Sequence, residues 1–140
     1  MSEPFTDTDV IIRLLTRDDP AKQAAAYALF RRVEAGELTI AAPDTVIADA
    51  VYVLSSPRLY RLPRADVHAL LVPLVQITGF RVANRRAVLR ALEVYASTRL
   101  DFGDAIIVAF MEQRSSNILY SYDTDFDRVP GLSRRAPDGQ

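Results

Sequence analysis

The sequence has 140 residues, of which 49% are hydrophobic, so it suits a single domain over residues 1–140 with a substantial core. It contains no cysteine, which excludes disulfides, thiolate zinc sites and a cysteine nucleophile. The net charge of −1 argues against a protein that coats nucleic acid electrostatically. All basic residues except Lys22 are arginines, a bias that we attribute first to overall composition and second to phosphate contacts.

Helical and strand-like segments alternate along the chain, which predicts a three-layer α/β/α sandwich with a mainly parallel central sheet. The first strand is expected at residues 4–6, and a helix follows from Val10. The next helix begins with Asp19 as N-cap and Pro20 at its first position, and a later one is expected to be capped by Asn84. Further strands are predicted at residues 38–42, 79–83 and 118–121, and further helices at residues 43–56, 64–77, 85–97 and 100–116.

The remaining features concern the ends of the chain and its apolar stretches. A short strand is predicted after residue 129, and the tail from about residue 134 is expected to be frayed. The longest apolar stretches fall well short of the roughly 20 residues that a membrane-spanning helix needs. We therefore expect a cytoplasmic, soluble protein with no membrane partner.

Acidic residues follow two of the predicted strands and begin one helix. Asp7 and Asp9 come after the first strand, Asp123 and Asp125 come after a late strand, and Asp104 lies in the first turn of the helix that feeds that late strand. Because the functional crevice of an open α/β sheet lies beyond the carboxyl ends of its strands, we expect these carboxylates to meet at one edge.

A cluster of carboxylates at one edge would point to metal chemistry. Several ionised carboxylates oppose one another's ionisation, and a hard divalent cation relieves that repulsion. Magnesium prefers oxygen ligands and bridges to substrate phosphate, where it activates water and offsets charge on the leaving oxygen. The chemistry implied is metal-assisted phosphoester hydrolysis.

Each of these acids also has a purely structural interpretation. Asp101 is a natural N-cap with Asp104 three residues later, and we favour capping for Asp101. Asp7 or Asp9 could cap the first helix. His68, the only histidine, lies among apolar helical residues, so a histidine-based mechanism has little support.

Four segments resemble the motifs of PIN-domain ribonucleases of the VapC toxin type. FTDTDVIIRLL resembles the opening strand and helix, with Asp7 at the first acidic position. PDTVIADAVYVL resembles the second motif, with Asp49 where glutamate is usual. LDFGDAIIVAFM places Asp104 at the third acidic position, and ILYSYDTDFDRVPGL places Asp123 at the fourth, with Ser121 matching a threonine.

The resemblance implies a PIN-like fold and an endoribonuclease that uses Mg²⁺ or Mn²⁺. Asp7, Asp104 and Asp123 would hold the metal, Asp49 would bind it directly or through water, and Ser121 would orient a carboxylate or the attacking water. Asp9 and Asp125 would be auxiliary groups. Asp9 stands where the family usually has asparagine, so it adds a charge near the metal. No departure from the family pattern removes a metal-capable oxygen.

The resemblance also implies partners. The substrate would be RNA, the chain would be the toxin of a toxin–antitoxin pair bound by a small antitoxin protein, and it would form a homodimer. Tyr60 and Leu62 beside an apolar helix mark a candidate antitoxin groove, with ordinary core packing as the alternative. Arginines at positions 13, 85 and 86 could contact RNA phosphates, and solvated helix faces explain them equally well.

Two other functions compete with this interpretation. The DTDV sequence matches the signature of haloacid-dehalogenase-like phosphatases, in which Asp7 would be a nucleophile and Asp9 the acid and base. That family needs a late lysine, and Lys22 is too early to serve. The other alternative is a catalytically inactive PIN-like module that binds protein or RNA, which the substitutions at Asp9, Asp49 and Ser121 keep open.

Overall fold

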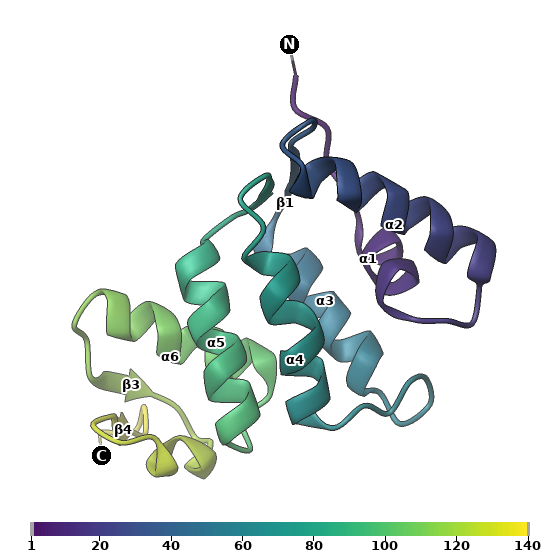
Figure 1. Ribbon diagram of the computed structural model, residues 1–140. Coiled ribbons are helices and arrows are strands. Elements are labelled where there is room, and N and C mark those ends of the chain that lie inside the picture. Colours follow the sequence, from purple (N-terminus) through teal and green to yellow (C-terminus); the bar gives the residue numbers. More distant parts are fainter. Residues whose placement is uncertain (1, 140) are drawn as a thin grey trace.

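The computed structural model describes residues 2–139, which alternate between helices and short strands (Figure 1). This alternation confirms the predicted α/β class. Among these residues, no helix is both long and apolar enough to cross a membrane. In chain order the elements are α1 (Thr8–Leu15), α2 (Pro20–Glu34), β1 (Ile40–Ala42), α3 (Asp44–Ser55), α4 (Arg64–Val75), β2 (Phe80–Val82), α5 (Arg85–Ser97), α6 (Phe102–Gln113), β3 (Ile118–Tyr120), the 3-10 helix η1 (Thr124–Arg128) and β4 (Ser133–Arg135).

All strand pairs are parallel, as predicted, but they form two separate groups instead of one central sheet. In the first group β1 pairs with β2, and Phe5 forms a bridge with Ala41 on the other side of β1. In the second group β3 pairs with β4. Figure 1 shows the reason: β3 and β4 lie beside α6, and α5 separates them from the first group.

The helices pack on one another nearly in chain order, from α2 and α1 through α3 and α4 to α5 and α6 (Figure 1). The core between them is apolar and continuous. In its first half, the rings of Phe30 and Phe80 meet edge to face with centroids 5.3 Å apart. A side chain at Gly79 would be crowded there, because a Cβ would lie 3.0 Å from the Val33 carbonyl oxygen. The side chains that are almost completely buried are Phe80, Ile11, Ile47, Leu54, Leu71, Leu92, Leu100, Val33, Val67, Val75 and Val88.

Arg64 and Arg90 hold the second half of the molecule together. The Arg64 guanidinium donates hydrogen bonds to the carbonyls of Tyr95 (2.9 Å), Arg99 (3.2 Å) and Leu100, at the turn between α5 and α6. It also lies over the Tyr95 ring, 4.2 Å from the centroid. Arg90 on α5 makes two hydrogen bonds to Glu112 on α6, at 2.7 and 3.1 Å. Arg64 therefore holds the segment before α6, and Arg90 holds the C-terminal end of α6 against α5.

Several local predictions differ from the structure in instructive ways. Asn84 precedes α5, but its side chain forms no cap, so that prediction was wrong. It adopts a left-handed conformation with φ 57° and donates a hydrogen bond to Asp44 at 3.0 Å, which fixes the start of α3 beside that of α5. Helix α4, which contains Pro73, ends at Val75 and is two residues shorter than the predicted helix at residues 64–77. Strand β4 reaches Arg135, within the segment that was expected to be frayed.

Candidate active site

The start of α6 places two acidic residues beside each other. Asp101 is the N-cap: its carboxylate accepts a hydrogen bond from the Asp104 N–H at 3.1 Å, which confirms the capping interpretation. Asp104 lies in the first turn and is half-buried. Burial and the nearby carboxylates of Asp101, Asp123 and Asp125 raise the pKa of Asp104 to about 6. Asp123 and Asp125, which follow β3, therefore raise the pKa of Asp104 at the start of α6.

The turn after β3 is built by side-chain to backbone hydrogen bonds. The Ser121 Oγ accepts from the Asp123 N–H at 3.0 Å, and the Asp123 carboxylate accepts from the Asp125 N–H at 2.9 Å as the cap of η1. Arg134 on β4 donates to the Ser121 carbonyl at 3.1 Å and makes two bonds to Asp127, at 2.8 and 3.2 Å. These contacts fix the backbone that carries Asp123.

Asp7, Asp9 and Asp49 lie elsewhere. Asp7 is exposed and caps α1 by accepting a hydrogen bond from the Val10 N–H at 3.2 Å. Asp9 is exposed and forms an ion pair with Arg13 at 3.5 Å, and Asp49 is exposed on α3. Neither Asp7 nor Asp49 is among the groups that shift the pKa of Asp104.

The four predicted acids are thus only partly brought together, as Asp104 with Asp123. Within residues 2–139, no three acidic or histidine side chains are arranged closely enough to hold a metal ion. The acids are separated in the same way as the strands. Asp7 follows the segment that contains the Phe5 bridge, and Asp123 follows β3. A missing pairing between two strands therefore separates the carboxylates that follow them.

The donor chemistry of the α6 and β3 group fits a hard divalent cation. Asp101, Asp104, Asp123 and Asp125 offer only oxygen atoms, which Mg²⁺ and Mn²⁺ prefer. Burial and neighbouring carboxylates raise the pKa of Asp104, and no basic residue is among the groups that act on it. A cation at this place would stabilise the ionised form of Asp104, which the protein alone disfavours.

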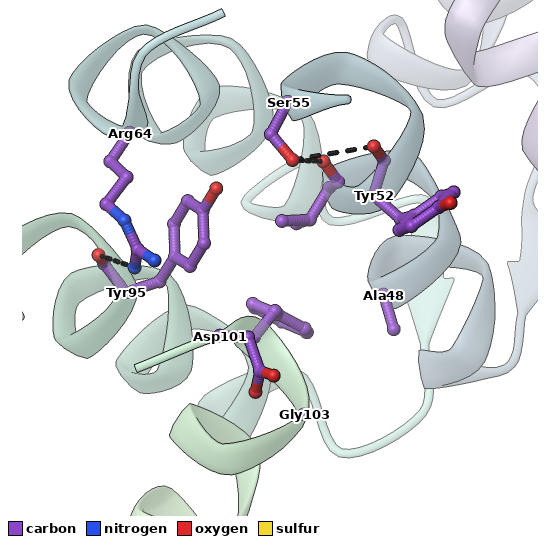
Figure 2. Close-up of a pocket in the computed structure, with 9 residues that line it drawn as sticks. Ala48, Tyr52, Ser55, Arg64, Tyr95, Asp101 and Gly103 are labelled. Carbon is purple, nitrogen blue, oxygen red and sulfur yellow. Dashed lines mark hydrogen bonds between the residues drawn. The ribbon is translucent and has the colours of Figure 1, made fainter. Parts of the chain in front are cut away.

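A cavity of about 330 Å³ adjoins the start of α6 (Figure 2). Ala48, Tyr52 and Ser55 on α3 form one wall, and Asp101 with Gly103 on α6 forms another (Figure 2). Sequence reasoning did not find this cavity, nor the role of Arg64, because the carbonyls that Arg64 binds lie 31 to 36 residues further along the chain. No local pattern signals such a contact.

The arginines that were considered for RNA contacts differ in their environment. Arg13 lies 3.5 Å from both Asp9 and Asp18, and Arg85 donates to the backbone carbonyls that precede and begin β2. Both are therefore used within the fold. Arg86 is exposed at the start of α5. His68 lies half-buried on α4 and is not one of the groups that act on Asp104.

Comparison with known proteins identifies the family. Among solved structures, the chain is similar to VapC20 from Mycobacterium tuberculosis, described as a toxin that cleaves the sarcin-ricin loop, with 19% identity and a TM-score of 0.39 over 91% of this chain and 95% of that chain. No curated protein gives a significant match. The family model of the PIN domain matches residues 5–132, so this chain belongs to the PIN domain family.

Proposed function

We propose that this PIN-domain chain is a Mg²⁺- or Mn²⁺-dependent endoribonuclease and the toxin of a type II toxin–antitoxin pair. The observation that carries the proposal is the group formed by Asp104 and Asp123, in a chain whose family assignment covers residues 5–132. Asp104 is half-buried among carboxylates with no basic partner, which is unfavourable for the fold alone and supports a function in binding a cation. The substrate would be RNA in the cytoplasm.

Each residue of the proposed site has a distinct task. Asp104 and Asp123 would hold the ion, which would supply an activated water for attack on phosphorus, and the predicted ligands Asp7 and Asp49 would have to approach them to complete the site. Ser121 fixes the turn that carries Asp123, since its Oγ accepts the Asp123 N–H at 3.0 Å. Asp101 holds the first turn of α6 and thereby orients Asp104. Together these contacts limit the movement of two carboxylates before any cation binds.

The test compares RNA cleavage by wild type, Asp104→Asn and Asp123→Asn in Mg²⁺ and in EDTA. Asp138→Asn is the matched control, because Asp138 is an exposed aspartate near the C-terminal end of the chain. We expect cleavage in Mg²⁺ that leaves 5′-phosphate ends, disappears in EDTA and is lost in both site variants but kept in the control. Wild type that folds and leaves RNA intact in Mg²⁺ and in Mn²⁺ would contradict the proposal.

A second candidate function is a PIN-like module that binds protein or RNA without catalysis. It is favoured by one observation, that residues 2–139 contain no group of three metal-capable side chains. Titration of the wild type with Mn²⁺ in a calorimeter separates the two candidates. Heat that disappears in Asp104→Asn supports the nuclease, whereas wild type without Mn²⁺ uptake supports the binding module. The phosphatase alternative is discounted by membership of the PIN family.

We also propose a small antitoxin as protein partner, on the basis of the toxin assignment. Tyr60 and Leu62, the first candidates for its groove, are half-buried and pack against the core. A better candidate is a groove of about 300 Å³ lined by residues of α1, α2 and α4, among them the exposed Tyr27 and Leu70 and Leu74. Replacing Leu70 with glutamate should weaken antitoxin capture in a pull-down and leave RNA cleavage unchanged.

A further inference from the structure

The cavity of about 330 Å³ lies between two helices that carry predicted metal ligands (Figure 2). Helix α3 carries Asp49, and its neighbours Ala48 and Tyr52 line the cavity from that side. Helix α6 carries Asp104, and its N-cap Asp101 lines the cavity from the other side. A molecule that occupies the cavity therefore lies beside the acids of the proposed active site.

The cavity has an exposed mouth and a buried interior. The Tyr52 side chain is 71% exposed, and Asp101 is exposed as well, so both residues lie at the mouth. The interior is formed by Val51, Tyr95 and Phe102, which are only 3% to 4% exposed. The rings of Tyr95 and Phe102 pack edge to face, with their centroids 6.3 Å apart. An apolar, partly aromatic interior of this kind suits the faces of a flat ring.

The hydroxyl group of Tyr95 is the one feature of this interior that the fold does not use. A buried tyrosine usually finds a hydrogen-bond partner for its hydroxyl. Arg64 contacts the Tyr95 ring and the Tyr95 carbonyl, but within residues 2–139 no group forms a hydrogen bond with the hydroxyl. Figure 2 shows the ring extending away from α5 beside Arg64, with the hydroxyl at its far end. This group is therefore available to a bound molecule.

The charges around the cavity restrict the kind of molecule that fits. The Arg64 guanidinium is occupied by the carbonyls of Tyr95, Arg99 and Leu100, so it offers little to an anion. The carboxylate of Asp101 at the mouth repels an anion further. The occupant should thus be neutral and flat, with apolar faces and polar groups along its edge. A nucleobase has all of these properties, and its phosphate does not.

We propose that this cavity binds one unpaired base of the RNA substrate. The Tyr95 hydroxyl forms a hydrogen bond with the edge of that base, and the exposed Tyr52 ring at the mouth stacks on the next base. The phosphodiester stays outside the cavity, on the side of the proposed active site. This inference rests on the proposed nuclease function and makes unpaired RNA the substrate class, because a paired base would have to give up its pairing and stacking to enter.

The decisive variant is Tyr95→Phe, which removes only the hydroxyl and keeps the ring that Arg64 covers. Its binding to short fluorescent RNA single strands, one for each of the four bases, is measured by anisotropy in EDTA, which prevents cleavage by the proposed mechanism. A strand of the same length that has the sugar-phosphate backbone but no bases is measured in parallel. Tyr27→Phe, at an exposed tyrosine on α2, is the matched control.

We expect the wild type to bind at least one of the four strands about tenfold more tightly than the strand without bases. Tyr95→Phe should weaken binding to that RNA about fivefold, and Tyr52→Ala should weaken it about tenfold, whereas Tyr27→Phe should match the wild type. No variant should alter binding to the strand without bases. Equal binding of both kinds of strand by the wild type would overturn the proposal, as would a Tyr95→Phe variant that binds every strand like the wild type.

Urea unfolding separates base binding from a structural role of the hydroxyl. Because the fold does not use this group, Tyr95→Phe should unfold at the same urea concentration as the wild type or at a higher one. A variant that binds RNA more weakly and is also clearly less stable would show that the hydroxyl supports the fold, which overturns its assignment to the base.

Cleavage in Mg²⁺ separates this inference from the proposed function. In RNA that the wild type cleaves, Tyr95→Phe should raise KM and leave kcat nearly unchanged, because the base is held equally before and during the reaction. Cleavage with an unchanged KM, and with equal rates on RNA that has an abasic nucleotide at the cleavage site, would overturn the base cavity and keep the nuclease. Binding that depends on bases, without cleavage of any RNA in Mg²⁺ or Mn²⁺, would reject the nuclease and keep the cavity as part of an RNA-binding module.

Discussion

Two acidic groups in the last third of the chain differ in whether an arginine pairs with them. Asp127 accepts two hydrogen bonds from Arg134, and this arginine holds the pKa of Asp127 below its ordinary value. Asp104 is more buried and faces only other carboxylates, which together with that burial raise its pKa to about 6. A compensated acid can be explained by the fold, whereas an uncompensated one requires another explanation, for which a bound cation is the simplest.

The largest effect should be on catalysis and should separate these two acids. If the proposed function holds, Asp104→Asn should reduce Mg²⁺-dependent RNA cleavage on the order of 100-fold or more, because it removes the charge of a proposed metal ligand. Asp127→Asn should lower the cleavage rate much less, because Arg134 still holds the Ser121 carbonyl when the contact with Asp127 is lost. Initial rates on one RNA at saturating Mg²⁺ provide the measurement. Equal losses in both variants would remove the distinction between the two acids.

The second effect concerns Arg64, whose contacts hold the segment before α6 and so help to position Asp104. Arg64→Ala removes the hydrogen bonds to three carbonyls at the turn before α6 and the contact with the Tyr95 ring. We expect the free energy of unfolding in urea to fall by about 2–3 kcal/mol. Arg58→Ala, at an exposed arginine in the loop before α4, is the control and should change stability little. A loss in both variants of the same size would refute this role of Arg64.

The local elements of this fold were predictable because their signals are local. Asp19 and Pro20 begin α2, Asp101 caps α6, and the order of helices and strands follows from the apolar pattern. The capping of α5 by Asn84 was wrong because a distant partner, Asp44, takes its side chain. A contact between segments far apart in sequence overrides the local preference of an asparagine for capping a helix.

The candidate site was predictable only in part for the same reason. Asp104 and Asp123 come together because α6 and β3 are consecutive elements. Asp7 follows a strand that lies more than a hundred residues from β3 in the sequence, and no spacing in the sequence specifies whether the two strands come together. The Ser121 contact with the Asp123 N–H spans only two residues, but motif position pointed to Ser121 without specifying this backbone contact.

The third effect concerns stability. The Asp104→Asn variant, which should lose RNA cleavage, should be more stable than the wild type. Asp104 binds its proton more tightly in the folded state, with a pKa of about 6 against an ordinary 3.8, so the free energy of unfolding should fall as pH rises from about 4 to 6. Asp104→Asn removes this penalty and should stabilise the metal-free protein at pH 7 by about 1 kcal/mol after allowance for solvent screening.

Urea unfolding in EDTA at pH 4, 5, 6 and 7 measures this effect. The difference between Asp104→Asn and wild type should be smallest at pH 4 and grow until about pH 6, while Asp138→Asn should follow the wild type throughout. A variant that is less stable than wild type at pH 7 would show that Asp104 is compensated by some group after all, and the contrast with Asp127 would then disappear.

The smallest effect should come from the compensated acid and should have the opposite sign. Arg134 lowers the pKa of Asp127, so the pair stabilises the folded state above the ordinary pKa of an aspartate and loses this contribution as pH falls below it. Asp127→Asn should therefore be slightly less stable than wild type at pH 7, and the difference should shrink as pH falls. Because both side chains reach solvent, added salt should shrink the difference at pH 7, as it does for exposed ion pairs. A stabilising effect of Asp127→Asn at pH 7 would place Asp127 with Asp104 among the uncompensated acids.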